Sequence, residues 1–145
     1  MKLRLTLLAL LAALVAVPFT PIQSAEDEPE TELGAKMEKM SGAFRALRRQ
    51  IEDATKNEDS LARLAAIKEN AEAALKLEPA RKAEIPAAKQ AAFVADFRAK
   101  MKEFIGVVER TEAALRAGNN AEAARLVGVM ADTQKQAHGD FRKKK

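Results

Sequence analysis

The chain has 145 residues, of which 32% are charged and 4% are aromatic, and its formal net charge at pH 7 is +4. It contains no cysteine, which excludes disulfides, iron–sulfur clusters, cysteine zinc sites and thiol chemistry. The basic residues are spread along the chain and cluster only at its carboxyl end, so this small positive charge gives no reason to expect nucleic-acid binding.

The first 25 residues have the pattern of a secretory signal peptide. Their apolar run of 13 residues is shorter than the roughly 20 residues that a transmembrane helix needs. We therefore predict a cleaved signal peptide at residues 1–25 and an exported domain at residues 26–145, with an uncleaved signal anchor as the alternative. Removing this segment, which holds two basic residues and no acidic one, would leave a net charge of +2. The pattern consists of Lys2 and Arg4, an apolar run over residues 5–17, and the small residues Ser24 and Ala25 at the expected cleavage point.

The first two predicted helices cover about residues 31–55 and 58–77. Apolar residues in the first repeat at steps of four and three, which is the heptad pattern of a bundle helix. Asn57 is the expected N-cap of the second, and a linker over residues 78–85 follows it. The expected buried faces are Leu33, Met37, Met40, Phe44, Leu47 and Ile51 in the first helix, and Leu61, Leu64, Ala65, Ile67, Ala71, Ala74 and Leu75 in the second.

The third and fourth predicted helices cover about residues 87–117 and 120–141. Gly118 is expected to end the third helix, and Asn119 or Asn120 to cap the fourth. The expected buried faces are Phe93, Phe97, Met101, Phe104, Val108, Thr111 and Leu115 in the third helix, and Ala124, Val127, Ala131, Gln134, His138 and Phe141 in the fourth. Because the connections within each pair of helices are short, the predicted fold is all-α, an antiparallel up-down-up-down four-helix bundle.

Two residues in this bundle could carry chemistry, namely Met37 and the only histidine, His138. Taken singly, each is more often a packing residue than a ligand. In the predicted topology, however, the start of the first helix and the end of the fourth lie at the same end, and both residues fall within about 10 Å of it. A thioether and an imidazole that face inward at one level could be the axial pair of a haem iron. Ala35 and Ala131 could open a slot for the ring, and Phe97 could lie against it.

These residues stand in a recognisable order, and the sequence resembles the cytochrome b562 family. The resemblance rests on L-G-A-K-M-E-K-M at 33–40, D-F-R at 96–98, Gly106, A-G at 117–118 and A-H at 137–138. It implies a periplasmic electron carrier, not an enzyme, with a single non-covalent haem b held by Met37 and His138 and packed on Phe97. The carrier would be a monomer that serves unidentified redox partner proteins. It would bind no nucleic acid and would not insert stably into a membrane.

Two positions depart from the family pattern. Met101 replaces a phenylalanine one turn after Phe97, and Gln134 replaces an arginine four residues before His138. The segment Q-K-Q-A-H at 134–138 also lacks the cysteines of a C-x-x-C-H attachment motif, so a haem there would be held without thioether bonds.

Two other functions stay open at this point. A haem-free periplasmic bundle that acts in protein interaction or stress response would keep the same helices, with His138 as a boundary residue. Copper(I) could bind the soft donors Met37 and Met40 together with His138. A di-iron centre is excluded, because such bundles need more than one histidine.

Overall fold

The computed structural model of the protein describes residues 31–142. The described residues form α1 (Glu32–Arg48), η1 (Ala54–Lys56), α2 (Asn57–Ala74), η2 (Ala80–Glu84), α3 (Ala87–Arg116) and α4 (Asn120–Phe141), where η marks a 3-10 helix. This part of the chain contains no strand, and the predicted all-α four-helix bundle is confirmed. The predicted signal peptide and its boundary with the domain lie outside the described residues.

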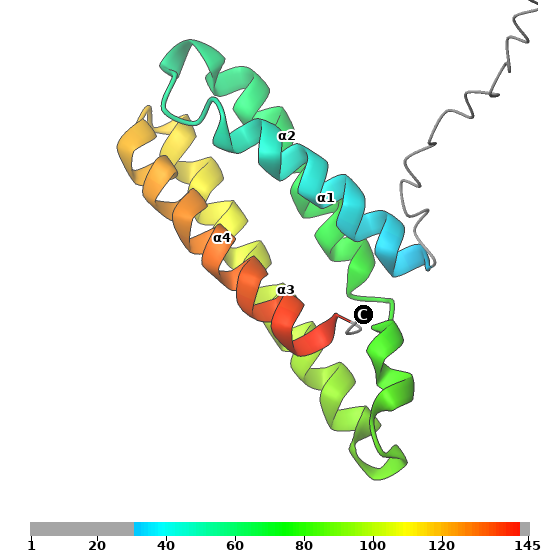
Figure 1. Ribbon diagram of the computed structural model, residues 1–145. Helices are drawn as coiled ribbons and strands as arrows, with labels where there is room; N and C mark the ends of the chain where they lie inside the picture. The colour runs from blue at the N-terminus through cyan, green and yellow to red at the C-terminus, as the bar shows by residue number, and fades with distance from the viewer. Residues whose placement is uncertain (1–30, 143–145) are drawn as a thin grey trace, which may run out of the picture.

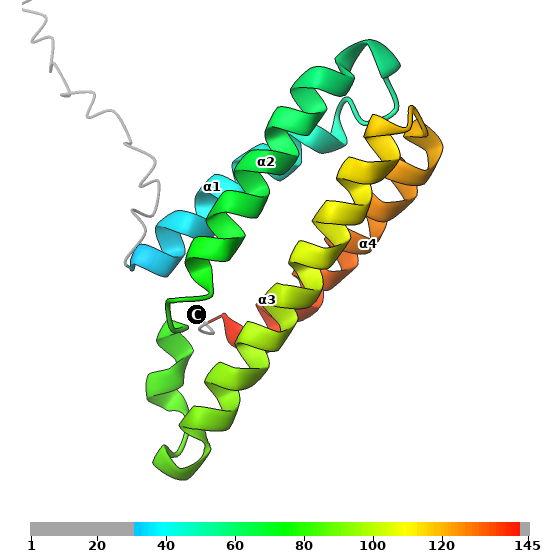
Figure 2. The same ribbon diagram turned by 180° about the vertical axis from the view of Figure 1, so that it is seen from behind.

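The bundle consists of two helical hairpins, α1 with α2 and α3 with α4, which meet mainly through α2 and α3. Both connecting turns lie at one end, here called the loop end, while α1 begins and α4 ends at the other, the terminal end (Figure 1). Seen from either side, α3 runs past the other helices at the terminal end, and η2 folds back beside its first turns (Figures 1 and 2). Helices α1 and α4 approach each other less closely than the two helices of either hairpin do.

Local hydrogen bonds explain where α1 begins and ends. The hydroxyl oxygen of Thr31 accepts a bond of 3.0 Å from the amide of Gly34, so Thr31 is the N-cap. The helix ends at Arg48, seven residues before the predicted limit of 55. The amides of Arg49 and Gln50 there bond to carbonyls only three residues back, and this tightening turns the chain towards η1.

The predicted N-cap of α2 is wrong, because Asn57 is the first helical residue and Lys56 caps the helix without a side-chain bond. The side-chain amide of Asn57 bonds to another helix instead. Its Nδ2 donates to Oδ1 of Asn120, and the Asn120 Nδ2 donates in return to Oδ1 of Asn57, at 3.2 and 2.7 Å. Asn120 also donates to the carbonyl of Ile51 at 2.8 Å. These bonds join the two hairpins at the loop end.

The turn between α3 and α4 agrees with prediction. Gly118 adopts a φ of 71°, the left-handed conformation that glycine reaches without a Cβ penalty. The amides of Gly118 and Asn119 bond back to the carbonyls of Leu115 and Ala114, which closes the end of α3 as a Schellman motif. The Asn119 side chain then accepts from the amide of Glu122 and caps α4.

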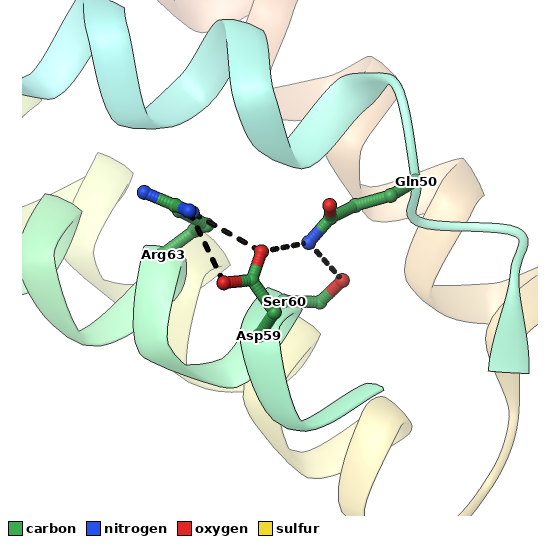
Figure 3. A network of polar contacts seen from close by, with 4 residues as sticks. All are labelled: Gln50, Asp59, Ser60 and Arg63. Carbon is green, nitrogen blue, oxygen red and sulfur yellow. Dashed lines mark hydrogen bonds and ion pairs between the residues drawn. The ribbon is translucent and has the colours of Figure 1, made fainter. Parts of the chain in front are cut away.

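A second polar network at the loop end ties the end of α1 to the first turn of α2 (Figure 3). The Gln50 Nε2 donates to Oδ2 of Asp59 at 2.6 Å and to the buried hydroxyl of Ser60 at 3.1 Å. Arg63 donates to both carboxylate oxygens of Asp59. The bonds from Gln50 and then from Arg63 lower the pKa of Asp59, so this carboxylate stays charged and keeps accepting both donors.

The apolar core has two parts. A loop-end cluster contains the largest fully buried side chains, and a terminal-end cluster is smaller and holds several half-buried residues at its edge. The loop-end cluster is formed by Phe44, Leu47, Ile51, Leu64, Ile67, Val107, Val108, Leu115, Ala123, Leu126, Val127 and Met130. The terminal-end cluster is formed by Leu33, Met40, Ala71, Ala74, Phe97 and Met101, with Met37 and Phe141 packed against it.

The buried face of α4 differs from the predicted one. The buried residues are Ala123, Leu126, Val127 and Met130, so only Val127 belongs to the expected set. Helix α4 packs chiefly on α3, where the Thr111 hydroxyl lies 3.8 Å from the Met130 sulfur. The apolar residues that face α3 are therefore the covered ones. Apolar spacing alone cannot show which neighbour a helix contacts most closely.

Candidate functional site

Met37 lies in the second turn of α1, near the terminal end of the bundle. Its side chain is half-buried against the terminal-end cluster, whereas Met40, one turn later, is only 7% exposed within that cluster. The Met40 thioether is thus committed to packing. Of these two methionines, Met37 is the more exposed, and its choice over Met40 as the candidate donor stays a prediction.

Phe97 on α3 is 4% exposed and belongs to the same cluster as Met37. The fold therefore brings together these two residues, which are 60 positions apart in the sequence. Met101, which stands where the family pattern has a second phenylalanine, is 8% exposed and packs in that cluster as well. Its flexible side chain can fill the space within the cluster that a phenylalanine ring would take.

His138 lies in the last turns of α4 and is exposed, so the expectation that it faces inward on a buried seam is wrong for this structure. Phe141, three residues later, takes the inner position instead. Its ring centroid lies 5.3 Å from that of Phe93 and 5.5 Å from that of Phe97. The apolar ring of Phe141 forms the aromatic contact, and the imidazole of His138 is exposed to water.

The environment of His138 suits a neutral imidazole. Its side chain is exposed by surface area, yet neighbouring atoms cover enough of the ring that partial burial, and secondly the charge of Arg142, lower its pKa. Within residues 31–142 the ring makes no hydrogen bond or ion pair. The lowered pKa favours the neutral imidazole, the form in which one ring nitrogen is unprotonated.

Contact between α1 and α4 near this region is slight. The Gln134 Nε2 donates to the hydroxyl of Ser41 across a long 3.4 Å, and both side chains are half-buried. Ala131, one of the two residues expected to open a slot, packs instead against the loop-end cluster. Ala35 is half-buried on α1. The Gln134–Ser41 bond is thus a polar contact between two helices that otherwise approach each other only slightly.

Sequence patterns missed two contributions to this region. Arg81 on η2 donates from Nη1 to the carbonyl oxygens of Gly139, at 3.1 Å, and of Asp140. No periodicity could have singled it out, because it lies in a predicted linker and acts across 58 positions. Phe141 and Phe93 were both expected on inner faces, so the mutual contact of their rings was open to prediction from the bundle topology.

A groove of about 580 Å³ lies beside this aromatic contact. It runs between η2, α3 and the end of α4, and Arg81, Phe93, Lys100 and Phe141 are among its lining residues. Neither Met37 nor His138 lines it. Both candidate donors thus lie outside the groove, and Met37 packs against the terminal-end cluster.

The described residues contain no group of three or more His, Cys, Asp or Glu side chains that could hold a metal ion. Among these same residues, no helix combines the length and the hydropathy that crossing a membrane requires. The candidate donors, Met37 and His138, lie on α1 and α4, which run antiparallel to each other.

Comparison with known families gives one result. The family model described as cytochrome b562 matches residues 32–142, which span all four helices from the start of α1 to just beyond the end of α4. No curated protein and no solved structure matches the chain significantly.

Proposed function

We propose that this chain, which belongs to the cytochrome b562 family of haem-binding electron-transfer proteins, holds one non-covalent haem b between Met37 and His138. The observation that supports the proposal is that residues of α1, α3 and α4 come together at the terminal end. Met37, Phe97 and the last turn of α4 contact a single apolar cluster, although they come from three different helices.

The residues present fit a haem. Met37 offers a half-buried thioether, and His138 offers an exposed imidazole whose lowered pKa favours the neutral form. A thioether and an imidazole are the donor pair of electron-transfer cytochromes. The neighbouring apolar surface suits a flat macrocycle, and the weak contact between α1 and α4 leaves these helices free to admit one. Because the chain has no cysteine, the haem would be held by these contacts alone.

The chain's own residues then set the conditions for electron transfer. Bound haem would supply a one-electron change between ferric and ferrous iron. Met37, as a thioether donor, would favour the reduced state, and the apolar cluster around Phe97 would act in the same direction. If Met37 and His138 both held the iron, no position would remain for a substrate, which supports a carrier rather than an enzyme.

The cellular setting forms part of the same proposal. The signal-peptide pattern of residues 1–25 supports export, and we place the mature domain, residues 26–145, in the periplasm as a monomer. Its partners would be other redox proteins, which meet it near the end that carries Met37 and His138.

The proposal is tested by titrating the purified protein with haem and recording absorption spectra of the oxidised and reduced forms. We expect one equivalent to bind and to give six-coordinate, low-spin spectra. His138→Ala should lose this signature while helicity survives, and Gln136→Ala, at an exposed position on the same helix, should retain it. A parent protein that binds no haem would contradict the proposal and favour the haem-free bundle.

A further inference from the structure

Arg81 joins the linker between α2 and α3 to the end of α4. Its Nη1 donates to the carbonyl of Gly139 at 3.1 Å and also to that of Asp140. These are the two residues that directly follow His138 in the sequence. The cation is thus bound to the same helical turn that presents the imidazole.

The last turn of α4 needs such a contact. The final carbonyls of a helix have no partner within the helix and carry the negative end of its dipole, so a guanidinium group satisfies both their bonding and their charge. Gly139 is also among the weakest helix-forming residues, and it stands next to His138. Helical propensity alone stabilises this turn only weakly, so its conformation depends on tertiary contacts.

The linker that carries Arg81 is itself fixed at both ends. The Arg98 Nε on α3 donates to the carbonyl of Leu75 at 3.1 Å, where α2 ends. The Gln90 Nε2 donates to the carbonyl of Ile85 at 3.0 Å, where η2 ends. Both anchors come from α3, so Arg81 reaches α4 from a segment that is tied to the hairpin partner of α4.

We infer that Arg81 is a positioning residue for His138, holding the last turn of α4 in the conformation from which the imidazole can reach a haem. The inference that haem binding depends on Arg81 rests on the function proposed above. The inference that Arg81 orders the turn does not, because it concerns the haem-free chain. Arg81 touches neither donor and acts only through the backbone that follows His138.

The test compares Arg81→Gln with Lys82→Gln. Lys82 has the same charge and lies on the same 3-10 helix, but it pairs with Glu78 at 2.6 Å within the linker. In the haem-free protein, amide exchange over residues 138–142 should quicken in Arg81→Gln alone. In the haem titration, Arg81→Gln should weaken binding by about fivefold, which corresponds to about 1 kcal/mol, and Lys82→Gln should match the parent.

A third variant separates positioning from charge. A Cβ added at Gly139 meets no atom within 4 Å, so Gly139→Ala can strengthen the last turn without a clash. Added to Arg81→Gln, it should restore slow exchange and most of the haem affinity. Exchange that is equal in Arg81→Gln and Lys82→Gln would overturn the inference, as would weakened haem binding that Gly139→Ala does not restore. If the parent binds no haem, the proposed function fails, while the exchange data still decide whether Arg81 orders the turn.

Discussion

Truncating Phe141 tests whether the terminal end is packed as described. Phe141→Ala removes a half-buried ring that contacts Phe93 and Phe97, with centroids 5.3 and 5.5 Å away. Fully buried phenylalanines cost about 3–5 kcal/mol on truncation, so a half-buried one should cost about half of that. We therefore expect Phe141→Ala to lower the free energy of unfolding by about 2 kcal/mol.

The assay is urea unfolding of the haem-free protein, followed by circular dichroism. The free energy of unfolding should fall while the dependence on urea stays the same, since the unfolded chain exposes nearly the same surface. Phe44→Ala serves as the reference at the loop end, where the ring is 5% exposed within the larger cluster. Phe44→Ala should lower the free energy of unfolding by more, about 3–5 kcal/mol, because this ring is almost fully buried.

Phe141→Leu completes the comparison, because it keeps most of the apolar volume and removes only the ring contacts. We expect it to lose about 1 kcal/mol, roughly half the loss of Phe141→Ala. If Phe141→Ala unfolds at the same urea concentration as the parent, the last turn of α4 is not packed on α3.

Three further predictions concern the whole bundle. Haem at 100 times its dissociation constant should stabilise the chain by about 2.7 kcal/mol and raise the melting midpoint by about 10 °C; an unchanged midpoint would argue against binding to the native state. Asn120→Ala removes two donated bonds and leaves Asn57 without its partner amide, so it should cost about 2 kcal/mol in urea unfolding, and a neutral result would refute the role given to these bonds. Because burial lowers the pKa of His138, the unfolded chain binds a proton more readily, and the haem-free protein should lose stability as the pH falls below the ordinary value of 6.5. His138→Gln should remove this contribution, and an unchanged pH dependence in that variant would count against it.

The four-helix fold was predictable because it depends on sequence patterns within single helices and turns. Apolar spacing located the four helices, and short connections fixed their antiparallel order. The turn at Gly118 and the cap at Asn119 depend on single residues whose backbone and side-chain preferences are strong. The predicted N-cap at Asn57 was wrong, because the side chain of this residue bonds to Asn120, a partner 63 positions away, and not to the first turn of α2.

The candidate site was only partly predictable, for a related reason. Its position at the terminal end follows from topology, and Met37 and Phe97 do share a cluster there. His138 is exposed while Phe141, on the same predicted face of α4, contacts Phe97 on α3, and apolar spacing alone does not distinguish the two positions. Arg81 acts on backbone carbonyls far away in the sequence, so no side-chain pattern records its partner.

Ligation of the iron by Met37 is tested most directly by identifying which methionine methyl group lies against the haem. Carbon-13 labelling of the methionine methyl groups allows each to be followed by NMR in the reduced, haem-bound protein. A methyl group held over the face of the ring is shifted strongly by the ring current. We predict one such resonance, which disappears in Met37→Leu and stays in Met40→Leu. A shifted resonance that survives in Met37→Leu, or none in the parent, would contradict ligation by Met37.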